Sequence, residues 1–320
     1  MKTVKNKKSQ PLDIITKLQI LAITVGLITF PTCLKDTPTP PHNGNTANFQ
    51  VDLTPVAKLP SILYESSGLV IASPNKLWSH NDSGNENKLY CFNSSGNLLR
   101  SLTISNATNV DWEDLALDNE KRIYICDTGN NDNNRENLCI YRIPNPDTHT
   151  ENSIAADIIT FSFEDQIEFP PPISNRNFDV EAVIWHNDSL FMFTKDRSLP
   201  LTGYTKMYKI SAEPGNHTAT LAGSIYLGET NSSARVTAAD FHQKSNSLVL
   251  LVQERLIVFT NFEESNFLDG IATNFTFNQM PDQVEAIFFN DESTLTITEE
   301  GASNSPGWMY QVLLPAFQDK

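Results

Sequence analysis

Short hydrophobic runs alternate with polar turns along most of the chain. The runs are rich in β-branched and aromatic residues, and Asn, Asp, Gly and Ser separate them. No stretch sustains the period of about 3.6 residues that marks an amphipathic helix. The pattern therefore predicts a protein that is almost entirely β.

Five segments of the chain align with one another, and each is predicted to form a strand, a polar turn and a second strand. Their apolar anchor residues are spaced by 46, 68, 58 and 46 positions: Leu69, Leu115, Val183, Phe241 and Ile287. In most units a third strand follows, such as KLYCF, and a fourth precedes the next anchor, such as LLRSLTI. Four antiparallel strands repeated in this way predict the blades of a β-propeller.

The number of anchors predicts five blades, and a degenerate unit between residues 115 and 183 would make six the alternative. The segment NFQVDLTPV near Phe49 belongs to no unit. We expect it to be the outer strand of the blade whose inner strands are C-terminal, which closes the ring and removes exposed strand edges. Residues 49–320 are thus predicted to be a single propeller domain.

Polar residues recur at fixed places around each predicted hairpin. The turns are centred about five residues after the anchor, so the residue two before the anchor should lie opposite the residue twelve after it. Because side chains alternate along a strand, the residue four before the anchor should point to the same side as the residue two before it. The first strand of a propeller blade lines the central channel, so these residues are expected at one mouth of it: Glu65, Asn81, Asp111, Glu113, Asp127, Asp179, Glu181, Glu285 and Glu299, with Lys195 as the clear cation.

Carboxylates crowded into one concavity repel one another unless a cation or shared protons offset their charge. A hard cation with oxygen ligands, Ca²⁺ before Mg²⁺, is the natural partner of such a set. The alternative is that the acidic residues cap backbone N–H groups at strand ends. Asp127 also opens the loop DTGNNDNNREN, which is rich in side-chain oxygens and contains Arg135. Arg135 either pairs with a neighbouring acid or holds an anionic ligand over a cation.

The motifs VDWEDLALD, YICDTGNNDNNRENLCIYRIPNP, FDVEAVIWHNDSLFMFTKDR and QVEAIFF resemble an exported bacterial β-propeller family near the phytase-like, or "esterase-like activity of phytase", group. The likeness covers roughly residues 60–312. It implies a calcium-rich acidic mouth, with Glu113, Asp127, Glu181 and Glu285 as the metal-ligand positions. The fourth unit departs from the pattern, because Ala239 stands in place of the glutamate. The basic cluster that binds phosphate in a propeller phytase has no match beyond Lys195 and Arg135.

The charge of the chain limits the classes of partner that it can bind and indicates its compartment. The formal net charge is −15, and no basic cluster lies beyond the extreme N-terminus, which excludes a nucleic-acid partner. Residues 1–32 combine five Lys and one Asp with the apolar run LQILAITVGLITF, as in a secretory signal. Because Cys33 follows, we expect a lipoprotein signal, with plain secretion or a retained anchor as alternatives, and residues 33–48 as a flexible tether.

Three further cysteines, Cys91, Cys126 and Cys139, form no CxxC motif. They are either buried free thiols or, because export permits disulfides, include a Cys126–Cys139 bridge on adjacent strands.

Two functions follow from these observations. The first is a monomeric propeller, lipid-anchored or secreted, on the outer surface or in the periplasm. It binds a protein, a glycan or a small anionic ligand at its acidic mouth without catalysis, and Ca²⁺ is its one candidate cofactor. Its only membrane contact would be the N-terminal lipid. The second is a Ca²⁺-dependent phosphoesterase or esterase, in which Lys195 and Arg135 orient the substrate. No GxSxG, HExxH, Walker or GxGxxG motif occurs in the sequence.

Overall fold

The computed structural model describes residues 47–301 and 305–315. They belong to a compact unit that spans Pro40–Lys320. The predicted signal segment 1–32, Cys33 and nearly all of the predicted tether lie outside the described residues, so these interpretations stay predictions.

The described residues form 22 strands in four sheets, which confirms the predicted all-β class. The first sheet contains, in spatial order, β3 (Ser66–Ser73), β4 (Lys76–Asn81), β5 (Lys88–Phe92), β6 (Leu98–Ile104) and β10 (Ser153–Ile154). The largest contains β7 (Trp112–Leu117), β8 (Ile123–Asp127), β9 (Cys139–Ile143), β11 (Asp157–Phe163), β15 (Gly215–Tyr226), β14 (Tyr204–Ser211), β13 (Ser189–Lys195) and β12 (Asp179–His186). The third contains β16 (Val236–His242), β17 (Ser247–Val252), β18 (Arg255–Thr260), β19 (Ile271–Phe277) and β1 (Asn48–Val51). The fourth contains β20 (Val284–Phe289), β21 (Thr294–Glu299), β22 (Trp308–Leu313) and β2 (Thr54–Lys58).

Helical structure is limited to single turns in the described part of the chain. These are α1 (Asn231–Ala234) and the 3₁₀ turns η1 (Pro146–Thr148), η2 (Ile173–Asn175) and η3 (Phe267–Asp269). None of these is long and apolar enough to cross a bilayer.

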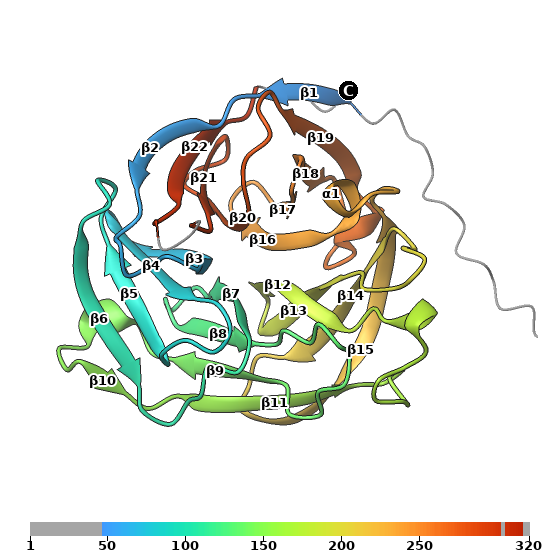
Figure 1. The fold of residues 1–320 in the computed structure, drawn as a ribbon, viewed down its shortest axis with the longest axis horizontal. Coiled ribbons are helices and arrows are strands. Elements are labelled where there is room, and N and C mark those ends of the chain that lie inside the picture. Colours follow the sequence, from blue (N-terminus) through green and yellow to red (C-terminus); the bar gives the residue numbers. More distant parts are fainter. Residues whose placement is uncertain (1–46, 302–304, 316–320) are drawn as a thin grey trace, which may run out of the picture. The chain divides into compact units, whose positions relative to one another are not determined.

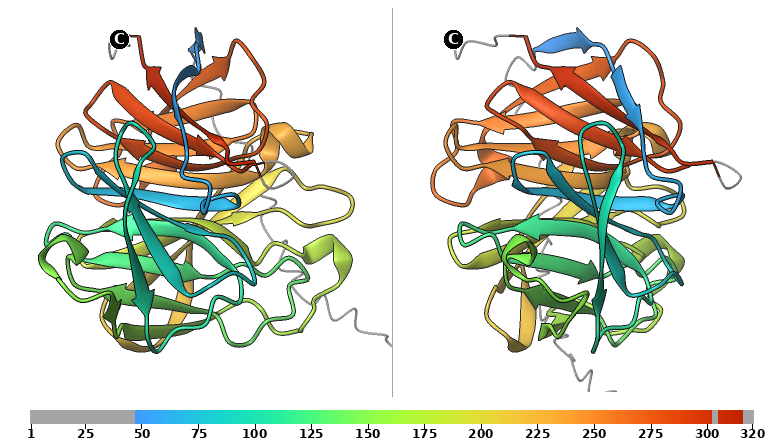
Figure 2. Two further views of the ribbon diagram at one scale, coloured as in Figure 1. Left: turned by 60° about the vertical axis from the view of Figure 1, so that its left-hand side comes forward. Right: turned by 90° about the vertical axis from the view of Figure 1, so that its left-hand side faces the viewer.

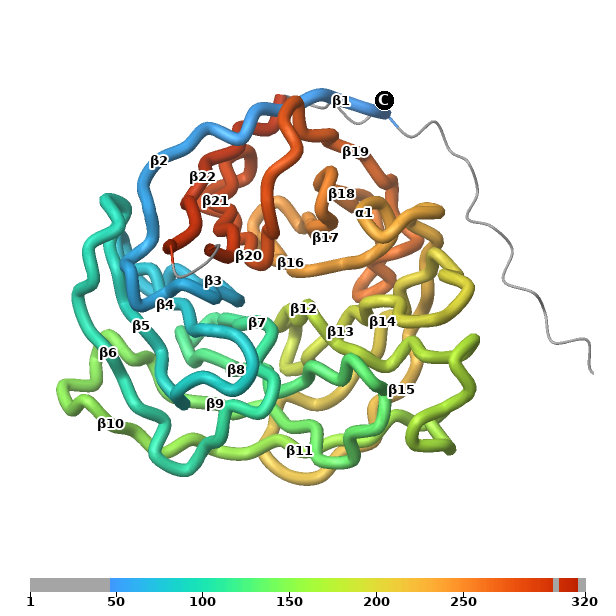
Figure 3. The backbone as a smooth tube through the Cα atoms, in the orientation of Figure 1, coloured from blue at the N-terminus to red at the C-terminus, as the bar shows by residue number. Residues whose placement is uncertain are grey.

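The innermost strands of the sheets surround a common axis (Figure 1). Strand β3 packs against β7, β7 against β12, β12 against β16, β16 against β20, and β20 against β3. The tube in Figure 3 shows how the chain completes one group of strands before it moves to the next around the axis. The two side views in Figure 2 show the sheets stacked face to face. The eight-stranded sheet arises because two outer strands, β11 and β15, pair in parallel.

Hydrophobic runs such as IYIC in β8 are continuous because both faces of the inner strands are buried. Ile123 and Ile125 pack into a cluster with residues of β3–β6, whereas Tyr124 and Cys126 pack into one with residues of β12–β14. Large side chains thus fill the spaces between neighbouring sheets, and their burial is the main stabilising contribution to the fold.

The N-terminal segment forms the predicted outer strand only in its second half. Strand β2 pairs antiparallel with β22 and so completes the C-terminal sheet, as expected. Strand β1 instead pairs in parallel with β19, on the outer edge of the preceding sheet. The segment therefore ties two neighbouring sheets together.

The predicted register is wrong by one residue in the β3–β4, β7–β8 and β20–β21 hairpins, where a β-bulge accounts for the difference. The difference is larger in the other two inner hairpins, where Lys195 lies opposite Asp179 rather than Glu181 and Ala239 lies opposite Leu250 rather than Gln253. Asp127 lies opposite Trp112 rather than Glu113, and Glu299 lies opposite Val284 rather than Glu285. The register shift occurs at an equivalent place in all five innermost hairpins, at Gly68, Glu113, Glu181, Thr237 and Glu285. A bulge adds one residue and re-aims its side chain, which strict alternation does not anticipate. In the fourth unit Thr237, and not Ala239, therefore occupies the place of the glutamate.

The three described cysteines are free and buried. In the β8–β9 ladder Cys126 lies opposite Ile140 and Cys139 opposite Asp127, so the two thiols are not partners. The Cys126–Cys139 bridge is not formed, and the free-thiol alternative is the one observed.

Candidate binding site at the acidic mouth

Three of the five bulges carry a glutamate, and these glutamates meet at one end of the ring. Oxygen atoms of Glu113, Asp179 and Glu181 lie within 4.8 Å of one another, and so do those of Asp82, Asp111 and Glu113. Glu113 belongs to both groups. We call these five carboxylates together with Glu285 the acidic mouth.

Two cations neutralise one side of the acidic mouth. Arg197 donates from Nε to Asp179 Oδ2 at 2.5 Å and from Nη2 to Glu181 Oε1 at 2.8 Å. Lys195 Nζ lies 3.0 Å from Glu181 Oε2. Burial alone would raise the pKa of Glu181, but Lys195 and Arg197 bring it below its ordinary value. The group Glu113, Asp179 and Glu181 is thus already supplied with positive charge.

The loop after β8 packs against the carboxylates through its backbone. The Gly129 N–H donates to Asp111 O at 3.1 Å, and the Asn130 N–H donates to Asp179 Oδ1 at 2.5 Å. A Cβ atom on Gly129 would lie 2.2 Å from Glu113 Oε1 and 2.4 Å from Asp111 Oδ2. Only glycine therefore lets the loop approach the carboxylates this closely.

Arg135 folds back onto the loop that contains it. It donates from Nη2 to Asp127 Oδ1 at 2.8 Å and from Nη1 to Gly129 O at 2.6 Å. Asp127 Oδ1 also accepts from the Asp111 N–H at 3.1 Å. Of the two alternatives for Arg135, the pairing with a neighbouring acid is therefore the one observed, and Asp127 shapes the loop beside the acidic mouth.

Glu113 stands apart from the other glutamates. Its side chain is 5% exposed, and no hydrogen bond or ion pair to its carboxylate is found among the described residues. Burial, and then the negative charges of Glu181, Asp82, Asp179 and Asp111, raise its pKa well above the ordinary value.

Two further carboxyls at the acidic mouth share this tendency to hold a proton. Burial raises the pKa of Asp82 to about 7, and the charges of Asp111 and Glu181 add to the effect. Burial also raises the pKa of Glu285 to about 8, although the nearby Lys195 opposes the shift. Without a cation these groups would therefore carry protons near neutral pH.

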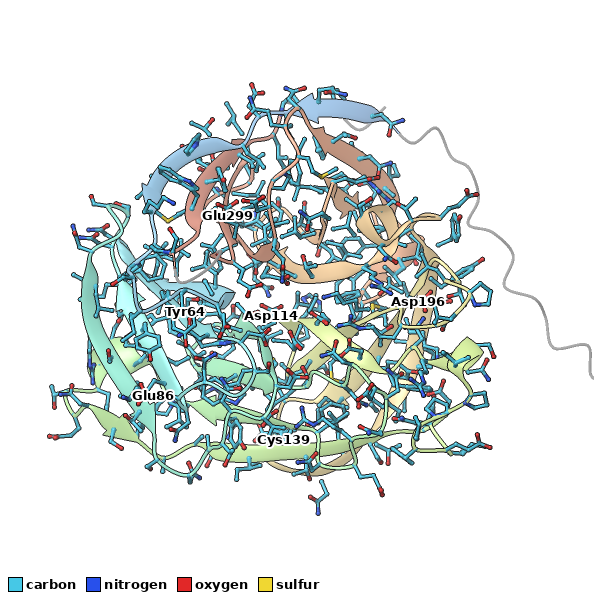
Figure 4. All side chains as sticks on the ribbon, viewed as in Figure 1. Tyr64, Glu86, Asp114, Cys139, Asp196 and Glu299 are labelled. Atoms are coloured by element: carbon cyan, nitrogen blue, oxygen red, sulfur yellow. The ribbon has the colours of Figure 1, made fainter. Side chains whose placement is uncertain are left out.

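Several predicted site residues are engaged elsewhere. Glu65 Oε2 accepts from Asn85 Nδ2 at 2.5 Å, and Asn81 Nδ2 donates to Ile62 O at 2.8 Å. Glu299 accepts from the Trp308 N–H at 3.1 Å and from the Tyr310 hydroxyl at 2.9 Å, both within its own sheet. In Figure 4, Asp114 on the inner strand β7 lies close to the axis, and Glu299 lies farther out. Of these contacts, only the one between Glu299 and the Trp308 N–H is an acidic residue that caps a backbone group, as in the alternative prediction.

The sequence argument missed Asp82 and Arg197. Asp82 directly follows β4, and Arg197 follows Lys195 by two residues in the motif TKDR. The charged residues that come directly after the second strand of each unit were the available signal. Asp82 and Arg197 both lie beyond the residue twelve after the anchor, which is the last position at which the repeat predicts a site residue.

The charges and ligand types at the acidic mouth suit a hard cation. Asp82, Asp111 and Glu113 bring three carboxylates together, and none of the ion pairs among the described residues includes them. Oxygen ligands from several carboxylates are what Ca²⁺ takes in proteins. The residues present fit such an ion, which would replace the protons that Asp82 and Glu113 otherwise retain.

No protein-family model and no curated protein sequence matches the chain. Among solved structures, the major Malassezia sympodialis allergen Mala s 1 matches with a TM-score of 0.57 and 12% identity, over 84% of this chain and 98% of that one. A PQQ-bound aldose sugar dehydrogenase from Streptomyces coelicolor matches with a TM-score of 0.47 and 11% identity, over 82% and 98%. A gluconolactonase from Xanthomonas campestris matches with a TM-score of 0.43 and 11% identity, over 78% of this chain and 72% of that one.

The fold is a β-propeller. At this level of identity the likeness extends to the fold and not to an activity.

Proposed function

We propose that this protein is an exported, five-bladed β-propeller that binds Ca²⁺ at its acidic mouth and, through the ion, an anionic partner. The observation that carries the proposal is Glu113, a residue only 5% exposed whose carboxylate belongs to both groups of metal-ligand geometry. A buried ionised carboxylate is costly unless it is paired. An ion at Asp82, Asp111 and Glu113 would supply that pairing.

The arrangement of the innermost strands supports five blades. Five of them pack in succession around the axis, and each has its bulge at the equivalent place. In this interpretation the eight-stranded sheet is two blades joined at their outer strands, and β2 completes the last blade. Between residues 115 and 183, β8, β9 and β11 belong to the second blade and β10 extends the first, which favours five blades over six.

We further propose that the protein acts at the cell envelope as a monomer held by a lipid on Cys33. This part of the proposal rests on the sequence alone: a basic and then apolar N-terminus, a cysteine at its end and a tether rich in Pro and Thr. The resemblance to the phytase-like group supports the exported propeller and the acidic mouth in the same way.

Binding is favoured over phosphoester hydrolysis because the cations near the acidic mouth are occupied. Lys195 and Arg197 pair with Glu181 and Asp179, and Arg135 pairs with Asp127. None of these three side chains is therefore free to bind a phosphate group. The ligand would then contact the ion itself, whose remaining coordination positions suit the oxygens of a carboxylate, a phosphate or an acidic glycan.

Thermal unfolding of the full chain with EDTA and with excess Ca²⁺ tests the proposal. A ligand that binds only the folded state raises the midpoint of unfolding. We expect a clear rise with Ca²⁺ at about pH 8, where the carboxylates ionise most readily. The Glu113→Gln variant should abolish the rise and should not lower the midpoint in EDTA, because it removes repulsion rather than a bond.

Glu86→Gln is the matched control, since the Glu86 side chain is 64% exposed and belongs to neither group of carboxylates at the acidic mouth. Its partners are Lys88, at 2.9 Å, and Tyr90. It should keep the full response to Ca²⁺. A midpoint that is unchanged by Ca²⁺ in the unmodified protein would overturn the proposal. Turnover of p-nitrophenyl phosphate that depends on Ca²⁺ and disappears in the Glu113→Gln, Glu181→Gln double variant would establish the hydrolase instead.

A further inference from the structure

A cavity of about 1050 Å³ opens at the other end of the ring from the acidic mouth. It lies among the turns that join the first two strands of four hairpins: β3–β4, β7–β8, β16–β17 and β20–β21. The carboxylates of the acidic mouth lie at or near the starts of the inner strands, and these turns follow their ends. Strand β3 alone has eight residues, which separates the two ends by roughly 20 Å. We call this space the hairpin-face cavity.

The wall of the hairpin-face cavity combines apolar surface with aromatic rings. Phe288 and Ile71 line it and are only partly buried, although each also packs on the hydrophobic core. The rings of His242 and Phe289 stack at a centroid distance of 5.5 Å with a tilt of 36°. Burial lowers the pKa of His242, so the imidazole is neutral near pH 7. The apolar side chains that this wall leaves partly exposed to a ligand are Phe288 and Ile71.

Uncharged amides and hydroxyls supply most of the remaining polar surface of the cavity. They come from six of the surrounding strands and turns: Ser73, Asn75, Gln243, Asn290, Thr294 and Gln311. Such side chains offer donors and acceptors together, which suits ligands with many hydroxyl groups. A few convergent polar groups on an apolar wall are the usual composition of a small-molecule site.

The charged residues at the cavity select neither an anion nor a cation. Asp118 is bound to Arg122 at 2.5 Å, and Asp291 accepts the N–H groups of Ser293 and Thr294 at 2.9 Å. Lys121 and Lys244 also line the cavity, so its acidic and basic side chains are mixed. No single sign of charge dominates this surface, in contrast to the acidic mouth.

Asp240 occupies a special place in the lining. Its Oδ2 accepts the Phe289 N–H at 2.7 Å, and none of the ion pairs found among the described residues includes it. Burial raises its pKa to about 7. Through its bond to Phe289, Asp240 joins β16 to the neighbouring inner strand β20 at the wall of the cavity.

We propose that the hairpin-face cavity binds a neutral carbohydrate unit, with the sugar ring against Phe288 and Ile71 and its hydroxyls on the surrounding amides. This site is independent of the acidic mouth and of the ion proposed there. The propeller would then have two binding ends, one for an anionic ligand held through an ion and one for an uncharged sugar.

Saturation-transfer NMR on the full chain tests this inference, with D-glucose, N-acetylglucosamine and cellobiose as probes. We expect saturation transfer to at least one of the three sugars. Ser73→Trp places a large ring at the cavity wall and should weaken that binding by about tenfold or more. Gln311→Ala, at an exposed position on β22, removes one amide and should weaken it less. Thr220→Trp, at an exposed position on β15, is the control for added bulk and should bind as the unmodified protein does.

The Glu113→Gln variant separates the two proposals, because it should lose the response to Ca²⁺ and keep the sugar signal. The inference is overturned if none of the three sugars shows transfer. It is also overturned if binding survives both Ser73→Trp and Gln311→Ala, with folding of each variant checked by its unfolding midpoint. Loss of the sugar signal in Glu113→Gln would overturn it as well, since the sugar would then be bound at the acidic mouth.

Discussion

Gly129 is the residue at which the loop backbone comes closest to the carboxylates of the acidic mouth. A methyl group there would lie 2.2 Å from Glu113 Oε1 and 2.4 Å from Asp111 Oδ2. Gly129→Ala should therefore displace two proposed ligands without removing a carboxylate. We expect the midpoint shift with Ca²⁺ to fall to a small fraction of its original size. Thermal unfolding with EDTA and with Ca²⁺ measures this difference.

Gly223→Ala is the control, because a methyl group on Gly223 would make only ordinary contacts, with Leu268 at 3.5 Å and Met207 at 3.8 Å. It should leave the response to Ca²⁺ unchanged. A full response in Gly129→Ala would show that the ion, if it binds, does not depend on the positions of Glu113 and Asp111.

At the residue scale, the sequence predicted the three bulge glutamates and Lys195 at one end of the ring, but it did not predict Arg197, the other cation that pairs with Glu181. Glu113, Glu181 and Glu285 were found because they repeat at one position relative to the anchors. Arg135 and Arg197 lie in loops, whose paths depend on contacts with other units such as the Asn130–Asp179 bond. A sequence repeat predicts the features that all units have in common. The loop conformations differ from unit to unit, so the repeat does not predict them.

The innermost strands are linked by buried carboxyl groups as well as by apolar packing. Asp114 on β7 is 1% exposed, and its Oδ2 accepts the Val183 N–H of β12 at 2.8 Å. Asp114→Ala would leave this N–H buried and without an acceptor. We expect the free energy of unfolding to fall by about 1–3 kcal/mol, measured by urea denaturation.

Asp114→Asn keeps an acceptor oxygen and should recover most of that loss. Asp157→Ala is the surface comparison, since the Asp157 side chain is 62% exposed and pairs with Arg142 at 3.0 Å. Its effect should stay within about 0.5 kcal/mol. Equal losses in Asp114→Ala and Asp157→Ala would contradict a role for Asp114 between β7 and β12.

At the element scale, strand positions were predictable because the inner strands carry continuous hydrophobic runs and the turns carry Asn, Asp and Gly. The hairpin register was not predictable, because a bulge is a feature of the backbone that adds a residue without changing the hydrophobic pattern. The division of NFQVDLTPV between β1 and β2 was missed for a related reason. Its two halves pair with different sheets, and strand partners so distant in sequence leave no local signal.

At the scale of the whole molecule, the acidic mouth should couple stability to pH and to Ca²⁺. Burial raises the pKa of Asp82 from 3.8 to about 7 and that of Glu285 from 4.5 to about 8. A raised folded-state pKa means that the folded protein binds more protons than the unfolded chain. These groups therefore stabilise the fold fully below their unfolded pKa, and that contribution is lost as the pH rises through about 7–8.

In EDTA, the unfolding midpoint should fall more steeply between about pH 6 and pH 8.5 in the unmodified protein than in an Asp82→Asn, Glu285→Gln variant. Ca²⁺ should act in the opposite direction. It binds the ionised carboxylates, so it competes with protons at low pH and replaces them at high pH. The midpoint shift with Ca²⁺ should therefore grow across the same range. A shift of equal size at both ends of the range would mean that the ion binds groups that are already ionised, and the protonated carboxyls of the acidic mouth would then not be its ligands.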